Sequence, residues 1–376
     1  MRAQQVLAVC LLAAAAAAIS FSIVDAATVA AKKVPQTDAE IEQEFQEWIG
    51  RMGEKQSSKV HVNGPKGVHY ATANADSEVK YIVVDKSGKG DYKSVNKAIK
   101  AIPKDAKERY IVHVRAGTYK EHVKIPSGMG PITLQGEGHT KTKITYNLDA
   151  TKAGGTLKSA SVSVKSDNFI AKDIAFENSS PQPEPGAVGK QAVAFEISGD
   201  KAAFYRCAFY GFQDTLYDRY GRHYFKDCKI VGSIDYIFGN GQSYYETCEL
   251  QSVAKTFGSL SAQKRMSAEE ETGYSFVDCT VKGTGYLYLS RAWGPYSRVV
   301  FIRTYFDPII RPEGWYNWGV PGREKTVFYG EYKCYGPGAN RKDREYWSYA
   351  LTDSQVAPFL TVDWVDGSDW IPRGPQ

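Results

Sequence analysis

The residues best suited to chemistry in this sequence are two aspartates and two glutamines at matched spacing. The interval from Asp214 to Asp235 is only one residue shorter than the interval from Gln191 to Gln213. Two carboxylates held close together cannot both ionise cheaply, so one keeps a proton while the other stays anionic. Such a pair can supply a general acid and a nucleophile or base, and the neutral amides can donate N–H groups to a developing oxyanion. The four residues therefore indicate hydrolysis of an ester or a glycoside.

A structural role for these residues is the competing interpretation. A lone aspartate in a turn usually hydrogen-bonds only to nearby backbone. Two aspartates and two glutamines that share one repeat spacing are harder to explain in this way, so we interpret them as a site.

Three more residues with useful chemistry follow further along the chain. Arg291 can clamp an aspartate with two parallel hydrogen bonds, although it can also form a surface ion pair that contributes little. Trp293 and Trp315 can stack on sugar rings or pack in the core, and the sequence leaves both interpretations open.

The elements that must position these residues follow from an internal repeat. One alternation of apolar and polar residues recurs in the segments Phe204–Phe209, Phe225–Ile230, Tyr245–Leu250 and Phe276–Val281. Strands that recur without intervening helices cannot form βαβ units, but they can stack as the turns of a solenoid. We therefore predict an all-β fold, a right-handed parallel β-helix, with a helix over Ser94–Ile102 capping its N-terminal end. In this fold Asp214 and Asp235 lie on adjacent turns, about 4.8 Å apart along the stack.

The cysteines follow the same repeat. Cys10 lies in the first 26 residues, and the five that remain are Cys207, Cys228, Cys248, Cys279 and Cys334. We expect them to form an inward-facing ladder, either as buried thiols or with a Cys207–Cys228 disulfide. No Cys or His cluster has the spacing of a zinc site, and no Gly-x-Ser-x-Gly motif is present. A zinc enzyme and a serine hydrolase of that type are therefore disfavoured.

Composition is that of an ordinary globular protein, and the N-terminal residues predict that it is secreted. It has 376 residues and a net charge of +5, which suits an acidic polysaccharide better than a nucleic acid. Residues 1–26 carry Arg2 and an Ala-rich apolar run, which predicts a signal peptide and secretion; the run is short for a membrane anchor. We expect a short tail or pro-segment over 27–77 and one β-helix domain over 78–376. The motif Asn178-Ser179-Ser180 is a sequon and fits an N-glycosylated, secreted product.

Taken together, the motifs resemble those of plant pectin methylesterases (pectinesterases). The likeness runs from about Glu78 to Trp370 and rests on the segments Gly117–Glu121, Gln191–Phe195, Gly211–Leu216, Asp235–Gly239 and Leu289–Trp293. The resemblance implies a secreted cell-wall enzyme that hydrolyses the C6 methyl esters of homogalacturonan and releases methanol. It implies no cofactor and no metal.

The resemblance also assigns roles to the four central residues. Asp235 stands where the family has its nucleophile, and Asp214 where it has the general acid that protonates methanol and then serves as base. Gln213 matches the residue that stabilises the oxyanion, and Gln191 matches a second amide that contacts the intermediate or substrate. These roles agree with the spacing argument.

Other matched positions are implied to bind the substrate. Arg291 and Trp293 match residues that hold the nucleophile and the sugar, and Ser161 falls where the family often has a substrate-contacting threonine. The family's last motif is usually Leu-Gly-Arg-Pro-Trp, and here Ser290 and Ala292 replace the glycine and the proline. We expect this change to alter loop geometry without loss of activity.

The expected partners are methyl-esterified pectin and a proteinaceous pectinesterase inhibitor, with no nucleic acid or membrane partner, and the expected state is a monomer. Residues 27–77 are too short, and contain no cysteine, for the inhibitor-like pro-domain of many plant members, so the chain resembles the branch without it. Two rival functions remain open. One is a polygalacturonase or pectate lyase on the same fold, and the other is a pectin-binding wall protein without catalysis.

Overall fold

The computed structural model describes residues 69–70, 79–184 and 186–371. The predicted signal peptide over 1–26, Cys10 and nearly all of the predicted tail over 27–77 lie outside the described residues. Within the described residues, no helix is both long enough and apolar enough to cross a membrane.

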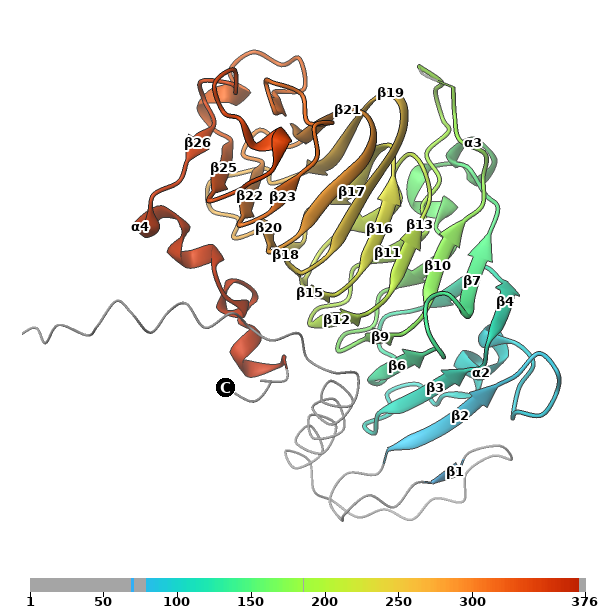
Figure 1. Cartoon of the computed structure of the whole chain (residues 1–376). Coiled ribbons are helices and arrows are strands. Elements are labelled where there is room, and N and C mark those ends of the chain that lie inside the picture. Colours follow the sequence, from blue (N-terminus) through green and yellow to red (C-terminus); the bar gives the residue numbers. More distant parts are fainter. Residues whose placement is uncertain (1–68, 71–78, 185, 372–376) are drawn as a thin grey trace, which may run out of the picture. The chain divides into compact units, whose positions relative to one another are not determined.

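Within the described residues, a first sheet of 12 strands runs through the whole fold. Its neighbouring strands are parallel, except that β1 and β2 are antiparallel. In spatial order they are β1 (His69–Tyr70), β2 (Lys80–Val84), β3 (Tyr110–Val114), β6 (Ile132–Gln135), β9 (Ile170–Lys172), β12 (Ala202–Tyr205), β15 (Arg222–Lys226), β18 (Gln242–Glu246), β20 (Gly273–Val277), β22 (Arg298–Ile302), β25 (Phe328–Tyr332) and β26 (Tyr349–Ala350). Figure 1 shows these strands stacked one above another.

The second sheet has two arms, which are joined because β19 and β21 are long enough to run through both. The first arm contains β4 (Gly117–Lys120), β7 (Thr142–Tyr146), β10 (Ala175–Asn178), β13 (Ala208–Tyr210), β16 (Lys229–Gly232) and β23 (Tyr305–Phe306). The other arm, here called the third face, contains β5 (Val123–Ile125), β8 (Val162–Val164), β11 (Phe195–Ile197), β14 (Leu216–Asp218), β17 (Ile234–Gly239) and β24 (Trp315–Tyr316). The connecting strands are β19 (Glu249–Gln263) and β21 (Thr280–Ala292).

Successive strands along the chain therefore fall in turn on the first sheet, the first arm and the third face, which makes a parallel β-helix. The all-β solenoid that the repeat predicts is confirmed. The repeated aromatic position stacks through the core, since Phe204, Phe225, Tyr245, Phe276 and Phe301 are register partners on adjacent strands. Their ring centroids are 4.5 to 4.6 Å apart from one turn to the next. A period of one turn in the sequence thus becomes a column of side chains.

The five described cysteines are free thiols, so the buried-thiol alternative holds and no Cys207–Cys228 disulfide is formed. Cys228, Cys248 and Cys279 each donate a hydrogen bond of 3.5 Å to the carbonyl of the aromatic residue one turn before. Thr304 occupies the same position between Cys279 and Cys334 and bonds to a carbonyl in the same way. The ladder is therefore one of small buried donors.

A left-handed residue precedes each member of this ladder, and another precedes Ile174, which holds the same position one turn before Cys207. These residues have φ between 46 and 55° and are Asp173, Arg206, Asp227, Thr247, Asp278, Arg303 and Lys333. Each makes the tight turn from the first sheet into the first arm. Two pairs on this ridge form ion pairs, Asp173 with Arg206 and Asp278 with Arg303, both at 2.7 Å.

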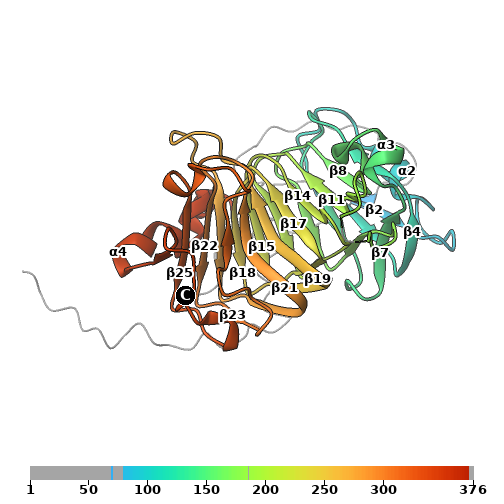
Figure 2. The same ribbon diagram turned by 90° about the horizontal axis from the view of Figure 1, so that it is seen from above.

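Short helices cover the ends and one side of the solenoid. The predicted capping helix is α2 (Val95–Ala101), whose buried Val95, Ala98 and Ile99 pack on β2, β3 and β5. The C-terminal segment covers the outer surface of the first sheet. Figure 2 shows α4, which begins this segment, at the C-terminal end of the solenoid beside β25. The remaining helical turns are α3 (Ala150–Ala153), η1 (Thr156–Ser159), η2 (Arg323–Lys325), η3 (Pro337–Ala339), α4 (Asp353–Val356), η4 (Ala357–Phe359), η5 (Val362–Val365) and η6 (Gly367–Asp369).

Candidate active site

Asp214 and Asp235 lie side by side on the third face. Leu216 of β14 pairs with Ile237 of β17, and Gln213 forms a bridge with Ile234, so an offset of one solenoid turn places the two aspartates in register. Both have left-handed backbones, with φ of 64° for Asp214 and 48° for Asp235. Non-glycine residues adopt this conformation at a cost, and it is common at functional sites.

Asp235 is held by two residues from later strands. Arg291 of β21 donates Nε to Oδ1 of Asp235 at 2.8 Å and Nη2 to Oδ2, which makes a bidentate ion pair. Ser259 of β19 donates its hydroxyl to Oδ1 of Asp235 and accepts the Asp235 backbone N–H at 3.0 Å. Arg291 and Ser259 therefore fix the position and the orientation of the Asp235 carboxylate.

Asp214 lies in the opposite electrostatic environment. Its side chain is only 8 % exposed, and no hydrogen bond to its carboxylate is found among the described residues. Burial raises the pKa of Asp214 well above its ordinary value of 3.8, the negative charge of Asp235 raises it further, and Arg291 partly offsets both effects. Asp214 is therefore the member of the pair whose environment favours keeping a proton.

The two glutamines flank this pair on adjacent turns. Gln213 immediately precedes Asp214, and its carbonyl accepts the N–H of Ala192 at 3.0 Å, which brings the Gln191 segment alongside. Both side chains are half-buried, and within the described residues neither amide has a hydrogen-bond partner. Their N–H groups can therefore serve a substrate oxygen near the aspartates.

Asn178 fixes the segment that carries Gln191. Its Nδ2 donates to the carbonyls of Leu148, Ser159 and Val193 at 2.9 to 3.0 Å, and Asn178 is 1 % exposed. Asn178 is the asparagine of the sequon, and its amide nitrogen is enclosed and fully bonded. In this conformation the three bonds engage the nitrogen to which an N-linked glycan would be attached.

Aromatic side chains form a floor beside the aspartates on the outer surface of the third face. Tyr217 and Phe238 stack at 4.2 Å, and Trp293 lies 6.1 Å from Phe238. Lys264 lies 4.5 Å from the centre of the Trp293 ring. A half-buried aromatic surface with a nearby cation suits an acidic carbohydrate.

The structure corrects two of the predicted substrate contacts. Trp315 has no exposed surface and stacks on Tyr329 at 4.6 Å inside the solenoid, so it is a core residue. Ser161 is also fully buried, and its hydroxyl bonds to the carbonyl of Tyr146 at 3.4 Å. Neither side chain can contact a substrate, because both belong to inward-facing positions.

Two residues that the sequence interpretation missed complete the site. Trp318 is half-buried, and the Arg291 guanidinium lies 4.3 Å from its ring centre. Its φ of 66° is rare for a bulky residue. Ser259 is the other, through its two hydrogen bonds to Asp235. The only sequence signal for Trp318 is its position shortly after Trp315, and nothing in the sequence marks Ser259.

The arrangement can perform nucleophilic hydrolysis. It offers an anion held in place, a neutral acid beside it and two amide donors. Within the described residues, no three His, Cys, Asp or Glu side chains are grouped so that they could hold a metal ion.

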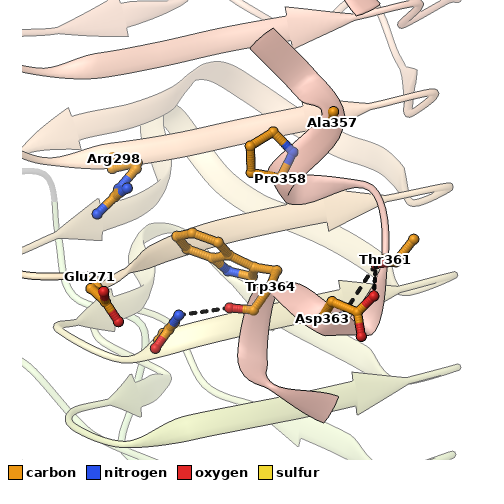
Figure 3. A pocket seen from close by; sticks show the side chains of 8 residues that line it. Glu271, Arg298, Ala357, Pro358, Thr361, Asp363 and Trp364 are labelled. Atoms are coloured by element: carbon orange, nitrogen blue, oxygen red, sulfur yellow. Dashed lines mark hydrogen bonds between the residues drawn. The ribbon is translucent and has the colours of Figure 1, made fainter. Parts of the chain in front are cut away.

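A separate pocket of about 450 Å³ lies between the C-terminal segment and the first sheet. Figure 3 shows Trp364, Arg298 and Glu271 among the side chains that line it. This pocket is on a different sheet from the two aspartates, and its lining combines one cation with two acids, Glu271 and Asp363.

Comparisons with known proteins agree on one family. The family profile described as "Pectinesterase" matches residues 81–368 of this chain. "Probable pectinesterase 8" from Arabidopsis thaliana is 45% identical over 299 residues, which cover 77% of this chain and 76% of that protein. "Pectinesterase QRT1" from the same plant is 42% identical over 330 residues, which cover 86% of this chain and 87% of that protein. The solved structure of pectin methylesterase from carrot superposes with a TM-score of 0.73 at 32% identity, covering 80% of this chain and 97% of that one.

Proposed function

This chain belongs to the pectinesterase family and is a carboxylic ester hydrolase that acts on pectin, and from this premise we propose that it hydrolyses the C6 methyl esters of homogalacturonan with Asp235 as nucleophile. The observation that carries this proposal is the pairing of Asp235, held by Arg291, with a buried Asp214 whose pKa is raised by burial and by Asp235. A carboxylate and a carboxylic acid in register are what a two-step ester hydrolysis needs.

In the first step an oxygen of Asp235 attacks the carbonyl carbon of the methyl ester. A new C–O bond forms, and the carbonyl electron pair moves to the oxygen, where the amides of Gln213 and Gln191 donate hydrogen bonds. The tetrahedral intermediate then collapses, and Asp214 gives its proton to the departing methoxy oxygen. Methanol leaves, and galacturonate is joined to Asp235 as an anhydride.

In the second step water releases the sugar. Asp214, now a carboxylate, takes a proton from a water molecule whose oxygen attacks the galacturonate carbonyl carbon. The bond to Asp235 breaks with its electron pair on Asp235, which restores the carboxylate and frees the acid. Asp214 is left protonated for the next cycle. In this scheme Arg291 orients Asp235, and Trp293 offers a face for a sugar ring.

The delivery and organisation of the enzyme are part of the same proposal. Residues 1–26 act as a signal peptide for export to the cell wall, residues 27–77 form a short tail, and residues 78–376 form the catalytic domain. The enzyme works as a monomer, and a proteinaceous pectinesterase inhibitor is a further partner.

The test is methanol release from highly methylated pectin by the purified chain and by Asp235→Asn. We expect the variant to lose at least about 10³-fold in kcat, because the amide is not a nucleophile, while binding to polygalacturonate is retained. Asp227→Asn is the matched control, since Asp227 has a similar left-handed φ of 53° on the turn ridge, away from the site.

Three results would contradict the proposal. Methanol release by Asp235→Asn at the wild-type rate would show that Asp235 is not the nucleophile. Binding of pectin without any methanol from the wild type would favour a binding protein. A drop in polymer length would favour a glycosidase or a lyase.

A further inference from the structure

The backbone at Asp235 departs from a regular strand. Between β17 and β19, Ile234 pairs with Ser259 and Ile237 pairs with Ser261, so β17 has one more residue than its partner over this stretch. This is a β-bulge, and Asp235 lies inside it with φ of 48°. A bulge removes residues from the regular ladder, so the N–H of Asp235 needs another acceptor.

Ser259 supplies that acceptor. Its hydroxyl oxygen takes the Asp235 N–H at 3.0 Å, and its proton is donated to Oδ1 of the same residue. One hydroxyl therefore ties the backbone of Asp235 to its own side chain. Ser259 is 1 % exposed, so water does not compete for these bonds.

The two oxygens of Asp235 are left unequal by this bond. Oδ1 accepts from both Ser259 and Arg291 Nε, whereas Oδ2 accepts from Arg291 Nη2 and from no other residue that the structure describes. Lone pairs that are already engaged as acceptors are poor nucleophiles, so Oδ2 is the oxygen better able to attack a carbonyl carbon.

We propose that Ser259 is a positioning residue that locks the bulged Asp235 in its reactive orientation and leaves Oδ2 as the attacking oxygen. This inference rests on the proposed function, because it assumes that Asp235 is the nucleophile. Ser259 acts through Asp235 and does not contact the substrate. Its loss therefore lowers the rate of the chemical step and not the binding of pectin.

The chain offers a matched control on the same strand. Ser261 is also fully buried on β19, but its hydroxyl bonds at 3.1 Å to the carbonyl of Leu289 and not to a catalytic group. Both serines lose one buried hydroxyl on substitution by alanine. A difference between the two variants therefore reports the contact with Asp235.

The experiment measures kcat and KM for methanol release by Ser259→Ala and Ser261→Ala, together with their melting temperatures. For Ser259→Ala we expect kcat to fall by about 10- to 100-fold, as misplacement of a reacting group commonly causes, with KM within about twofold of wild type. Ser261→Ala keeps the wild-type kcat whatever its melting temperature. Equal kcat values for the two variants would overturn the inference.

A second pair protects the test against misfolding. Ser259→Thr keeps the hydroxyl, and Ser259→Val has nearly the same shape as the threonine variant without it. We expect threonine to restore most of kcat and valine not to do so. Equal activity of Thr and Val variants would also overturn the inference. The inference about Ser259 can fail in this way while the proposed function survives, provided that the wild type releases methanol and Asp235→Asn does not. An inactive wild type would instead contradict the proposed function itself.

Discussion

Asp214 and Asp235 share a left-handed backbone, which aspartate tolerates better than most non-glycine residues but still adopts at some cost. Asp214 bears a second cost, because its carboxyl is buried beside another carboxylate. Hydrogen bonds from Arg291 and Ser259 stabilise the buried carboxylate of Asp235, whereas Asp214 has no such partner among the described residues. The buried Asp214 therefore lowers the stability of the fold, and the same burial favours the proton that Asp214 can donate.

This reasoning predicts how stability depends on pH. The folded state raises the pKa of Asp214 above 3.8, so between that value and the raised one the folded chain binds more protons than the unfolded chain. The favourable contribution of Asp214 is present below about pH 4 and is lost as the pH rises through the raised value. Asp214→Asn, which carries no charge, should therefore melt higher than wild type at neutral pH while losing esterase activity.

Melting curves between about pH 3 and pH 8 check this expectation, and the gain should shrink to nothing at the acid end. Asp235→Asn is the control of opposite sign, because it removes the partner of Arg291 and should lower the melting temperature at neutral pH. A lower neutral melting temperature for Asp214→Asn would contradict the assignment of Asp214 as a destabilised acid.

The sequence could predict which aspartates come together, because one turn of the solenoid preserves position along the chain. It could not separate Trp315 from Trp318, since a two-residue strand and the turn after it give too short a pattern to show which ring faces inward. The matched position of Ser161 predicts a substrate contact, but its burial is set by packing that a motif does not record. Ser259 is hidden for another reason, because the bulge in β17 shifts the register by one residue.

At the scale of elements, the turn between the first sheet and the first arm is the most regular unit of the fold. Seven left-handed residues form its ridge, and they include Asp227, Thr247 and Arg303. Aspartate tolerates this conformation, whereas a β-branched residue is the least suited to it. Thr247 is the one β-branched residue among the seven, so the ridge is most strained there.

Thr247→Asn should stabilise the chain. Asparagine adopts the left-handed region more readily, and the gain is partly offset by the lost bonds from the Thr247 hydroxyl to the Glu246 carbonyl and the Asp227 carboxylate. We expect a net gain of about 0.5–1 kcal/mol, seen as a rise of about 1–3 °C in melting temperature. Thr280→Asn, at the first residue of β21, where the strand pairs with β19 and β23, should lower it, because asparagine is disfavoured in strands. A fall for both variants would show that the turn is unstrained.

The repeat explains why the fold class could be predicted and the long strands could not. Cys207, Cys228 and Cys248 are spaced by one turn, and each spacing fixes a strand on all three faces. The next ladder cysteine, Cys279, follows only after a distinctly longer interval, in which β19 runs continuously through both arms. The longer spacing shows that this turn contains more residues. It does not show that the strands of two faces join into one continuous strand.

At the scale of the whole solenoid, the described residues contain no covalent cross-link, since all five of their cysteines are free. Each turn is stabilised by stacking on its neighbours, as the aromatic column through Phe225 and Tyr245 shows. Stability of this kind is a sum of contacts between adjacent turns.

The melting temperature should therefore be the same with and without a thiol reductant. The measurement is a pair of thermal melts of the purified chain, with a disulfide-bonded secreted protein as the control that must shift. A decrease of several degrees in reductant would mean that the ladder thiols had formed a disulfide.

The cysteine ladder has one more consequence. Four of its thiols, at Cys207, Cys228, Cys248 and Cys279, are buried on successive turns, and Cys334 is the partly exposed one. A thiol reagent in solution can reach a buried sulfur only when its turn opens. The order in which the sulfurs become labelled, beginning with Cys334, would record from which end and how far the stack unwinds.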